Sequence, residues 1–353
     1  MVCKHPVVQK QKIILLIAVT CLACYQQSAA QQLPDHDSLY YQSFAKFVTA
    51  RFYFSQKYTT LELEKDSYVT RFRYLPNTSL NTGIGVTYNS LTLNLGYGFG
   101  FLNPDKDKGK TKYLDLQSHV YGRKWTIDLF GQFYKGYYLS PKGLGAADPG
   151  QYYIRPDVNI SLAGVAIYNL LNPYKFSYRA ALLQNEKQKK SAGSFLAGIE
   201  LYYGSISADS SLVPSSIANQ YLQRGVRRLR FFKVGPGAGY AYTQVMGKHF
   251  FLTGSLTGNL SVDYSRQEGG NGKGSRVSVS PGYIYRIVMG YDNGNFNVNA
   301  SLVGNQLSVK SSNFDNKYFI NTGNFRLTLA KRIMPGTKLK KRLHPIDRLL
   351  EKK

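Results

Sequence analysis

The sequence predicts an all-β protein, an antiparallel transmembrane β-barrel of the outer-membrane type. Three observations support this fold class: an N-terminal export signal, long segments in which apolar and polar residues alternate, and aromatic residues near the ends of those segments. The alternation is clearest in residues 91–101, where Leu, Tyr or Phe holds every odd position and Thr, Asn or Gly every even one. A soluble β-sandwich also alternates, but its strands run to about five or six residues, shorter than these segments.

Composition narrows the class further. The 353 residues include 45 Lys and Arg against 20 Asp and Glu, which gives a net charge of +25. With 43% hydrophobic and 14% aromatic residues, the chain has enough apolar surface to fold, and this excludes a disordered protein. A basic chain often binds nucleic acid, but an exported barrel does not normally meet it, so we expect no nucleic-acid partner.

Residues 1–30 have the pattern of a signal peptide. Lys4, Lys10 and Lys12 precede an apolar stretch over residues 13–24, and Ser28-Ala29-Ala30 offers small side chains for cleavage. A lipoprotein signal ending at the third cysteine is the alternative. All three cysteines of the chain fall before the expected cleavage site, so the mature chain has none and a disulfide scaffold is excluded.

The remaining chain divides into three parts. Residues 31–43 form an N-terminal periplasmic segment, residues 44–330 the barrel, and residues 331–353 a basic periplasmic tail. Alternation and turn residues predict fifteen strands: 44–54, 58–66, 68–76, 80–89, 91–101, 111–122, 124–139, 158–170, 174–185, 191–206, 229–243, 249–264, 275–290, 295–309 and 317–330. A bacterial barrel with both ends in the periplasm needs an even number, so we expect about 14 strands, within a range of 12 to 16. The Ser-rich stretch 205–228 and the first strand are the places where the count is in doubt.

One group of polar residues is a candidate lumen cluster. Asp115, Gln117 and His119 share the face predicted to line the lumen, and Asp128 lies on the next strand. A hydrolase would need a nucleophile, a base and an orienting group within hydrogen-bond reach, and no Gly-x-Ser-x-Gly motif occurs. We therefore favour a hydrogen-bond network over catalysis and expect no enzyme activity. Scattered histidines and the absence of mature cysteines also predict no metal site and no cofactor.

A second group predicts a charge ladder in the lumen. Glu62 and Glu64 share a face of one strand, and Arg71 and Arg73 share a face of the next, with Glu62 opposite Arg71 if the turn is tight. Such ion pairs could brace the wall or act as a selectivity filter, and we favour bracing. Further basic residues are expected at lumen or rim positions and would make the interior positive: Lys175, Arg179, Arg230, Arg286 and Arg326.

Several motifs resemble a known family. The run 109–125, which contains Asp115-Leu116-Gln117 and Tyr121-Gly122-Arg123-Lys124-Trp125, resembles the uncharacterised domain-of-unknown-function family 4421 of outer-membrane barrels. Tyr74-Leu75-Pro76-Asn77 and the run 188–195 also fit that family. The resemblance spans roughly residues 38–332. It implies a location in the cell outer membrane and a barrel architecture, and it implies no particular activity.

Three functions are compatible with these features. The first is a channel or transporter for small solutes, with anions favoured by the positive interior. The second is a non-conducting barrel that serves as a membrane anchor or assembly platform for partner proteins or surface glycolipid, and the third is a barrel-embedded hydrolase. Outer-membrane lipid is an expected partner, because basic rim residues bind lipid phosphates.

The C-terminal tail is a candidate docking segment. Lys331 to Lys353 carries nine basic and two acidic residues, and Ile346, Leu349 and Leu350 recur at helical spacing after Pro345. We expect either a short amphipathic helix that docks on a periplasmic partner or a solvated tail.

Overall fold

The computed structural model describes residues 35–64, 71–89, 91–99, 105–270, 272–312 and 316–351. The predicted signal peptide, residues 1–30, lies outside these ranges. The chain divides into two units, Met1–Asp37 and Ser38–Lys353, and the second holds all the helices and strands described below. None of the described helices combines the length and the apolarity needed to cross a membrane.

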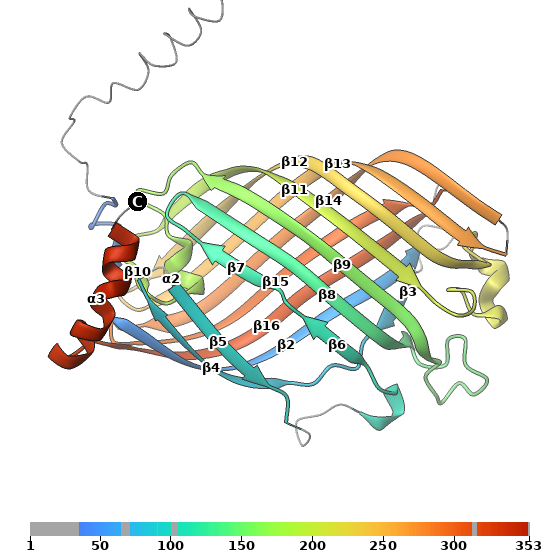
Figure 1. The fold of residues 1–353 in the computed structure, drawn as a ribbon, viewed down its shortest axis with the longest axis horizontal. Helices are drawn as coiled ribbons and strands as arrows, with labels where there is room; N and C mark the ends of the chain where they lie inside the picture. Colours follow the sequence, from blue (N-terminus) through green and yellow to red (C-terminus); the bar gives the residue numbers. More distant parts are fainter. Residues whose placement is uncertain are drawn as a thin grey trace, which may run out of the picture. The chain divides into compact units, whose positions relative to one another are not determined.

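Antiparallel strands form a closed wall (Figure 1). The ring closes where β16 pairs with β2 over almost their whole lengths, from Tyr318 opposite Leu63 to Ile333 opposite Val48. Ten strands of the described chain make up this ring, in the order β2 (Val48–Glu64), β16 (Lys317–Ile333), β15 (Phe296–Lys310), β14 (Gly272–Asp292), β13 (Phe250–Gly269), β12 (Val226–Met246), β11 (Ala192–Ser207), β9 (Ile154–Leu170), β8 (Trp125–Ser140) and β3 (Arg71–Leu75).

Four shorter strands belong to the same sheet but stand outside the ring: β4 (Asn81–Tyr88), β5 (Leu91–Tyr97), β6 (Lys112–Asp115) and β7 (Ser118–Tyr121). At one end of the barrel, β3 joins β2 directly to β8. Towards the other end, β4 and β5 extend the sheet from β2, while β6 and β7 extend it from β8. The sheet thus has 14 strands within the described residues, but only ten of them close the ring, so the prediction of a barrel of about 14 strands is not confirmed.

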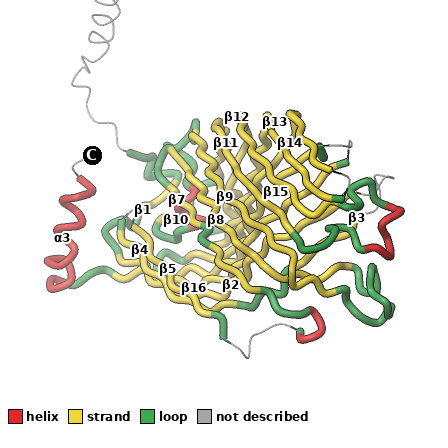
Figure 2. The backbone as a smooth tube through the Cα atoms, turned by 45° about the vertical axis from the view of Figure 1, so that its right-hand side comes forward, coloured by secondary structure: helices red, strands yellow, loops and turns green. Residues whose placement is uncertain are grey.

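The strands alternate as the sequence predicts. Along β13 every odd position from Phe251 to Gln267 is buried and every even position from Phe250 to Arg266 is exposed. The exposed face carries Leu256, Leu260 and other apolar side chains, whereas the buried face is polar. An apolar outer face around a polar interior is the arrangement of barrels that stand in a bilayer. Figure 2 shows the strands of this wall in yellow.

Residues 171–191 fill one end of the barrel, which we call the short-turn end because the turns 122–124, 247–249 and 293–295 lie there. The segment contains α2 (Tyr178–Leu182) and β10 (Glu186–Gln188), which pairs with β1 (Tyr41–Ser43). The prediction of a strand over 174–185 is therefore wrong. The Ser177 side chain caps α2 by accepting a hydrogen bond from the Ala180 N–H, which ends the extended conformation there.

Residues 208–225 fill the opposite end, which we call the long-loop end. This segment includes η3 (Ser215–Gln220) and buries Leu212 and Ile217 against the inner wall. The Tyr74 hydroxyl donates to the Leu212 carbonyl at 2.7 Å, and the Gln223 amide donates to the Glu64 carbonyl at 3.0 Å. Between the end of β11 at Ser207 and the start of β12 at Val226, the Ser-rich stretch thus holds a short 3-10 helix and no further strand.

Other strand boundaries also change. The predicted strands 44–54 and 58–66 are one continuous strand, β2, and the predicted strand 111–122 divides into β6 and β7. Besides η2 (Lys106–Lys108), the remaining helix of the described residues is α3 (Thr337–Glu351), which begins eight residues before Pro345 instead of after it. Because β16 extends to Ile333, the first residues of the predicted basic tail belong to the barrel wall.

Candidate functional site

A cavity of about 590 Å³ lies inside the wall beside the short strands. It is lined by β2, β4, β5, β15, β16 and the run from β6 to β7, and by Leu182, Leu183 and Gln184 of the segment 171–191. A drug-sized ligand occupies a pocket of roughly 300 to 1,000 Å³, so this cavity can hold a small molecule or the polar part of a larger one. We call it the side cavity.

Arg51 of β2 projects into the side cavity from a buried position. Odd residues of β2 face inward, so the alternation that buries Thr49 and Tyr53 also turns Arg51 to the interior. Its Nε donates to the Gln184 side chain at 2.8 Å, and its Nη2 donates to the Thr87 hydroxyl and to a backbone carbonyl. Its Nη1 is buried without a hydrogen-bond partner. Since these acceptors are neutral, the charge of Arg51 is not balanced by them.

Arg326 of β16 supplies a second positive charge. Its guanidinium carbon lies 4.4 Å from the centre of the Tyr53 ring, and its buried Nε has no hydrogen-bond partner. No carboxylate of the described residues lies within ion-pair distance of Arg51 or Arg326, and both side chains line the side cavity. The two arginines therefore leave an excess of positive charge in the side cavity.

Gly83 leaves room for the contact between the Tyr53 ring and Arg326. A Cβ atom built on Gly83 of β4 would lie 2.2 Å from the ring of Tyr53. The Tyr53 ring can therefore lie flat against β4, next to Arg326, only because residue 83 has no side chain.

The predicted lumen cluster lies at the edge of the same cavity. His119 of β7 faces Asp128 of β8 directly in the strand register, and His119 Nδ1 lies 2.5 Å from Asp128 Oδ1. Asp128 also accepts a hydrogen bond from Arg286, so this carboxylate has two cationic or donor partners. The buried Nε2 of His119 and the side-chain amide of Gln117 have no partner, and both residues line the side cavity.

Asp115 lies apart from this pair. It accepts hydrogen bonds from Lys57 at 3.0 Å and from the Tyr134 hydroxyl at 2.7 Å, and its own backbone pairs with β8. Within the predicted cluster, the Gln117 backbone N–H donates to Asp115 Oδ1 at 3.0 Å, and the His119 to Asp128 pair is a separate contact. No group of three or more His, Cys, Asp or Glu side chains in the described part of the chain could hold a metal ion.

The structure places the predicted charge ladder differently. Leu61 and Leu63 are fully buried in the interior, and Glu62 lies half-buried on the opposite face of β2. Glu64, at the end of the strand, is buried and accepts a hydrogen bond from the Lys317 backbone N–H at 3.0 Å. The register pairs Glu62 with Arg73, and Glu64 with Arg71, instead of Glu62 with Arg71. The side chain of Arg71 lies outside the described part of the chain. The prediction of a charge ladder in the lumen is therefore wrong, because Glu62 does not share the inward face of Leu61 and Leu63 and its partner in the register is Arg73.

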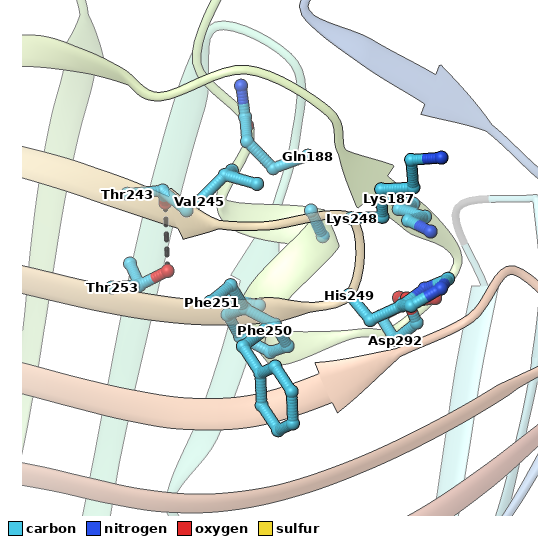
Figure 3. Close-up of a pocket in the computed structure, with 12 residues that line it drawn as sticks. Lys187, Gln188, Thr243, Val245, Lys248, His249, Phe250, Phe251, Thr253 and Asp292 are labelled. Carbon is cyan, nitrogen blue, oxygen red and sulfur yellow. Dashed lines mark hydrogen bonds between the residues drawn. The ribbon is translucent and has the colours of Figure 1, made fainter.

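A much smaller pocket, of about 10 Å³, lies between the segment 171–191 and the β12–β13 turn (Figure 3). Gln188 and Lys187 of β10 line it from one side, and Thr243 and Thr253, which are hydrogen-bonded at 2.8 Å, line it from the other. That volume holds about one water molecule. The pocket therefore marks close packing of the filling segment against the wall.

Sequence reasoning missed Arg51, although it placed Arg326 at a lumen or rim position. The signal was present, because Thr49, Arg51, Tyr53 and Ser55 share the odd face of β2. The four basic residues predicted alongside Arg326 have different surroundings. Arg286 is buried in the lumen and Arg179 is buried in α2, whereas Arg230 is exposed and the Lys175 ammonium lies over the Tyr40 ring.

The closed antiparallel wall, its apolar outer face and its polar interior define a β-barrel of the outer-membrane type. The chain belongs to the DUF4421 family, a domain of unknown function, whose model matches residues 35–332. No match to a curated protein was found.

Three solved structures resemble the barrel at low sequence identity. The outer membrane protease OmpT from Escherichia coli is 11% identical, with 83% of this chain and 98% of that chain covered and a TM-score of 0.38. The toluene transporter TodX of P. putida is 8% identical, with 82% and 91% covered and a TM-score of 0.24. The anion-selective porin from Comamonas acidovorans is 9% identical, with 81% and 99% covered and a TM-score of 0.15. Similarity at this level assigns no activity to this chain.

Proposed function

We propose that this protein is an outer-membrane barrel that binds an anionic group in the side cavity and does not form a continuous pore. The observation that carries the proposal is the pair Arg51 and Arg326, which line the cavity without a carboxylate partner among the described residues. Burying an unbalanced charge is costly, and a bound anion would offset that cost. The unpartnered donors on Arg51 and Gln117 provide hydrogen bonds for its oxygens.

The filled ends support the non-conducting part of the proposal. A solute crossing the lumen would have to displace residues 171–191 at one end and residues 208–225 at the other. Both segments are held by buried side chains and hydrogen bonds to the wall. This arrangement favours the predicted non-conducting barrel over the predicted channel, while the charge of the side cavity keeps the anion preference of the channel hypothesis.

The location follows from the outer face and the ends. Exposed apolar residues on β13 and β14 suit contact with lipid, and the short turns suit the periplasmic side of an outer membrane. On this basis we place the short-turn end, with the segment 171–191, towards the periplasm.

Binding of inorganic phosphate to the purified protein in neutral detergent tests the proposal. Isothermal titration calorimetry should detect binding to the parent chain, and Arg51→Gln or Arg326→Gln should weaken it at least about tenfold, equivalent to about 1.4 kcal/mol. Arg228→Gln is the matched control, because Arg228 pairs with Glu268 on the exposed surface. Unchanged affinity in both cavity variants, with heat-modifiable barrels on gels, would overturn the proposal.

A planar bilayer tests the closed lumen separately. The reconstituted barrel should show no sustained single-channel current, because both ends are filled. A steady current from the parent chain would refute this part of the proposal and restore the channel hypothesis.

A hydrolase has one observation in its favour, the pair of His119 and Asp128. The base and its orienting carboxylate are present, but no hydroxyl lies within hydrogen-bond distance of His119 Nε2 among the described residues. We therefore propose that the pair is not catalytic. Esterase and protease activity that disappears in His119→Ala would contradict this.

We further propose that α3 binds a periplasmic partner. From Thr337 to Pro345 its side chains are exposed or half-buried, so they are free to contact another molecule. A chain truncated after Met334 keeps all of β16 and should form a heat-modifiable barrel that no longer co-purifies with periplasmic proteins. Failure of the truncated chain to insert would instead make α3 part of the assembly signal.

A further inference from the structure

The barrel wall is interrupted beside the side cavity. Within the described residues, β5 pairs with β4 on one side only, and β6 and β7 pair with β8 on one side only. The chain nevertheless runs from β5 to β6, so these two sheet edges face each other across the interruption. We call this interruption the side opening, and define it by residues 91–97 on one edge and 112–121 on the other.

Exposure confirms that nothing in the described chain covers the edge formed by β5. All seven residues of β5 are exposed, including Thr92, Asn94 and Gly96, which are on the face turned towards the lumen. In β13, by contrast, the inward residues are all buried. Leu93 of β5 and Leu116 and Ser118 of the opposite edge line the side cavity, so the cavity extends to the opening.

The two sides of the opening differ in chemistry. Its outer rim is apolar, since the side chains of Leu91, Leu93, Leu95 and Leu116 are each more than half exposed. The interior behind this rim carries the guanidinium groups of Arg51 and Arg326, together with unpartnered polar atoms of Gln117 and His119. A ligand that matches both sides has an anionic head and an apolar body.

We propose that the side opening admits an anionic amphiphile from the surrounding membrane, with its head group on the two arginines and its acyl chains against the leucine rim. This inference rests on the proposed anion binding. The cavity of about 590 Å³ accommodates a head group, but not a complete two-chain lipid, so the chains remain outside the wall.

The backbone gives an independent reason for a polar occupant. Unpaired strand edges do not occur in contact with hydrocarbon, because each unsatisfied backbone group costs several kcal/mol there. The unpaired edges of β5 and β7 must therefore meet polar atoms, and a hydrated head group in the opening provides them.

A cleavable cross-link across the opening tests this entry route. The variant with Leu93→Cys and Ser118→Cys places one thiol on each edge, in a mature chain expected to have no other cysteine. The control variant, with Leu93→Cys and Val86→Cys, joins two directly paired residues of β4 and β5 and leaves the opening free. Both are treated with a flexible bismaleimide that contains a reducible disulfide.

Two probes are then compared: phosphatidic acid, measured by native mass spectrometry in neutral detergent, and inorganic phosphate, measured by calorimetry. The uncross-linked variant and the cross-linked control should retain phosphatidic acid. Cross-linking the opening should reduce the retained fraction at least about tenfold while phosphate still binds, and reduction of the linker should restore retention. Arg51→Gln with Arg326→Gln should abolish retention without a cross-link.

The outcomes separate the two proposals. Phosphate binding without phosphatidic acid retention, or equal retention in both cross-linked variants, would overturn the side entry and leave the anion site standing. Failure of both probes would overturn the anion site as well. If the parent barrel is a dimer that becomes monomeric on modification of the Leu93→Cys, Ser118→Cys variant but not of the control, the opening is a contact between two copies and the amphiphile proposal is wrong.

Discussion

Arg332 is expected to hold the segment 171–191 inside the barrel. Its guanidinium group donates two hydrogen bonds to the Asp292 carboxylate, at 2.6 and 2.7 Å. It also donates to the backbone carbonyls of Gln184 at 2.7 Å, Glu186 at 3.0 Å and Gly294 at 2.9 Å. One side chain thus joins the last strand of the wall to the filling segment and to the β14–β15 turn.

The effect of Arg332→Ala follows from the burial of this contact. Arg332 and Asp292 are both almost fully buried, and removing one partner of a buried ion pair costs about 3 to 5 kcal/mol. Two carbonyls of the filling segment lose their donor as well. If this cost falls on local opening of the segment, its amide exchange should accelerate by a factor of about 10² to 5 × 10³.

Hydrogen exchange read by mass spectrometry measures this directly. Peptides covering residues 178–188 should lose protection in Arg332→Ala, whereas peptides from β13 should not change. Arg228→Ala is the control, because its partly exposed pair with Glu268 is worth no more than about 1 kcal/mol. A folded Arg332→Ala barrel with protection of 178–188 within threefold of the parent would refute the anchoring role.

Two further predictions concern the interior. Gly83→Ala should displace the Tyr53 ring from Arg326 and weaken phosphate binding severalfold. In the control Gly258→Ala, the added Cβ has no atom within 4 Å, so the affinity measured by calorimetry should not change. Lys233→Met should lower the free energy of urea unfolding by about 3 to 5 kcal/mol, because it leaves the buried Asp263 carboxylate without its cationic partner. The double variant with Asp263→Leu should recover most of this loss. No recovery in the double variant would contradict this.

The barrel could be predicted because its strands repeat one simple pattern. Lipid outside and polar groups inside impose a period of two, and this period is visible in β13, β14 and β15 without any knowledge of contacts. The same period placed His119 and Asp128 on facing strands, where the structure pairs them. Local alternation was sufficient here because each residue's environment depends on the face it occupies.

The rest depended on contacts distant in sequence. The helix α2 has five residues, too few to show a helical period, and its burial comes from the wall around it. The prediction of a charge ladder in the lumen is wrong for another reason. Near the long-loop end the interior is an apolar cluster that includes Leu61, Leu63 and Leu212, so the intervening Glu62 lies on the opposite face of β2. The side opening could not be predicted either, since it depends on which strands do not pair.

The closure between β2 and β16 has a consequence for the order of assembly. It joins residues as far apart in the sequence as Val48 and Ile333, so the ring cannot be sealed before the whole chain is available. The segments 171–191 and 208–225, which adjoin the two ends of β11, must already be inside when the last strand docks. Closure of the ring is therefore the last step of assembly. A variant in which one of these two segments folds poorly will fail to assemble, so it will be observed as unassembled chain and not as a barrel of low stability.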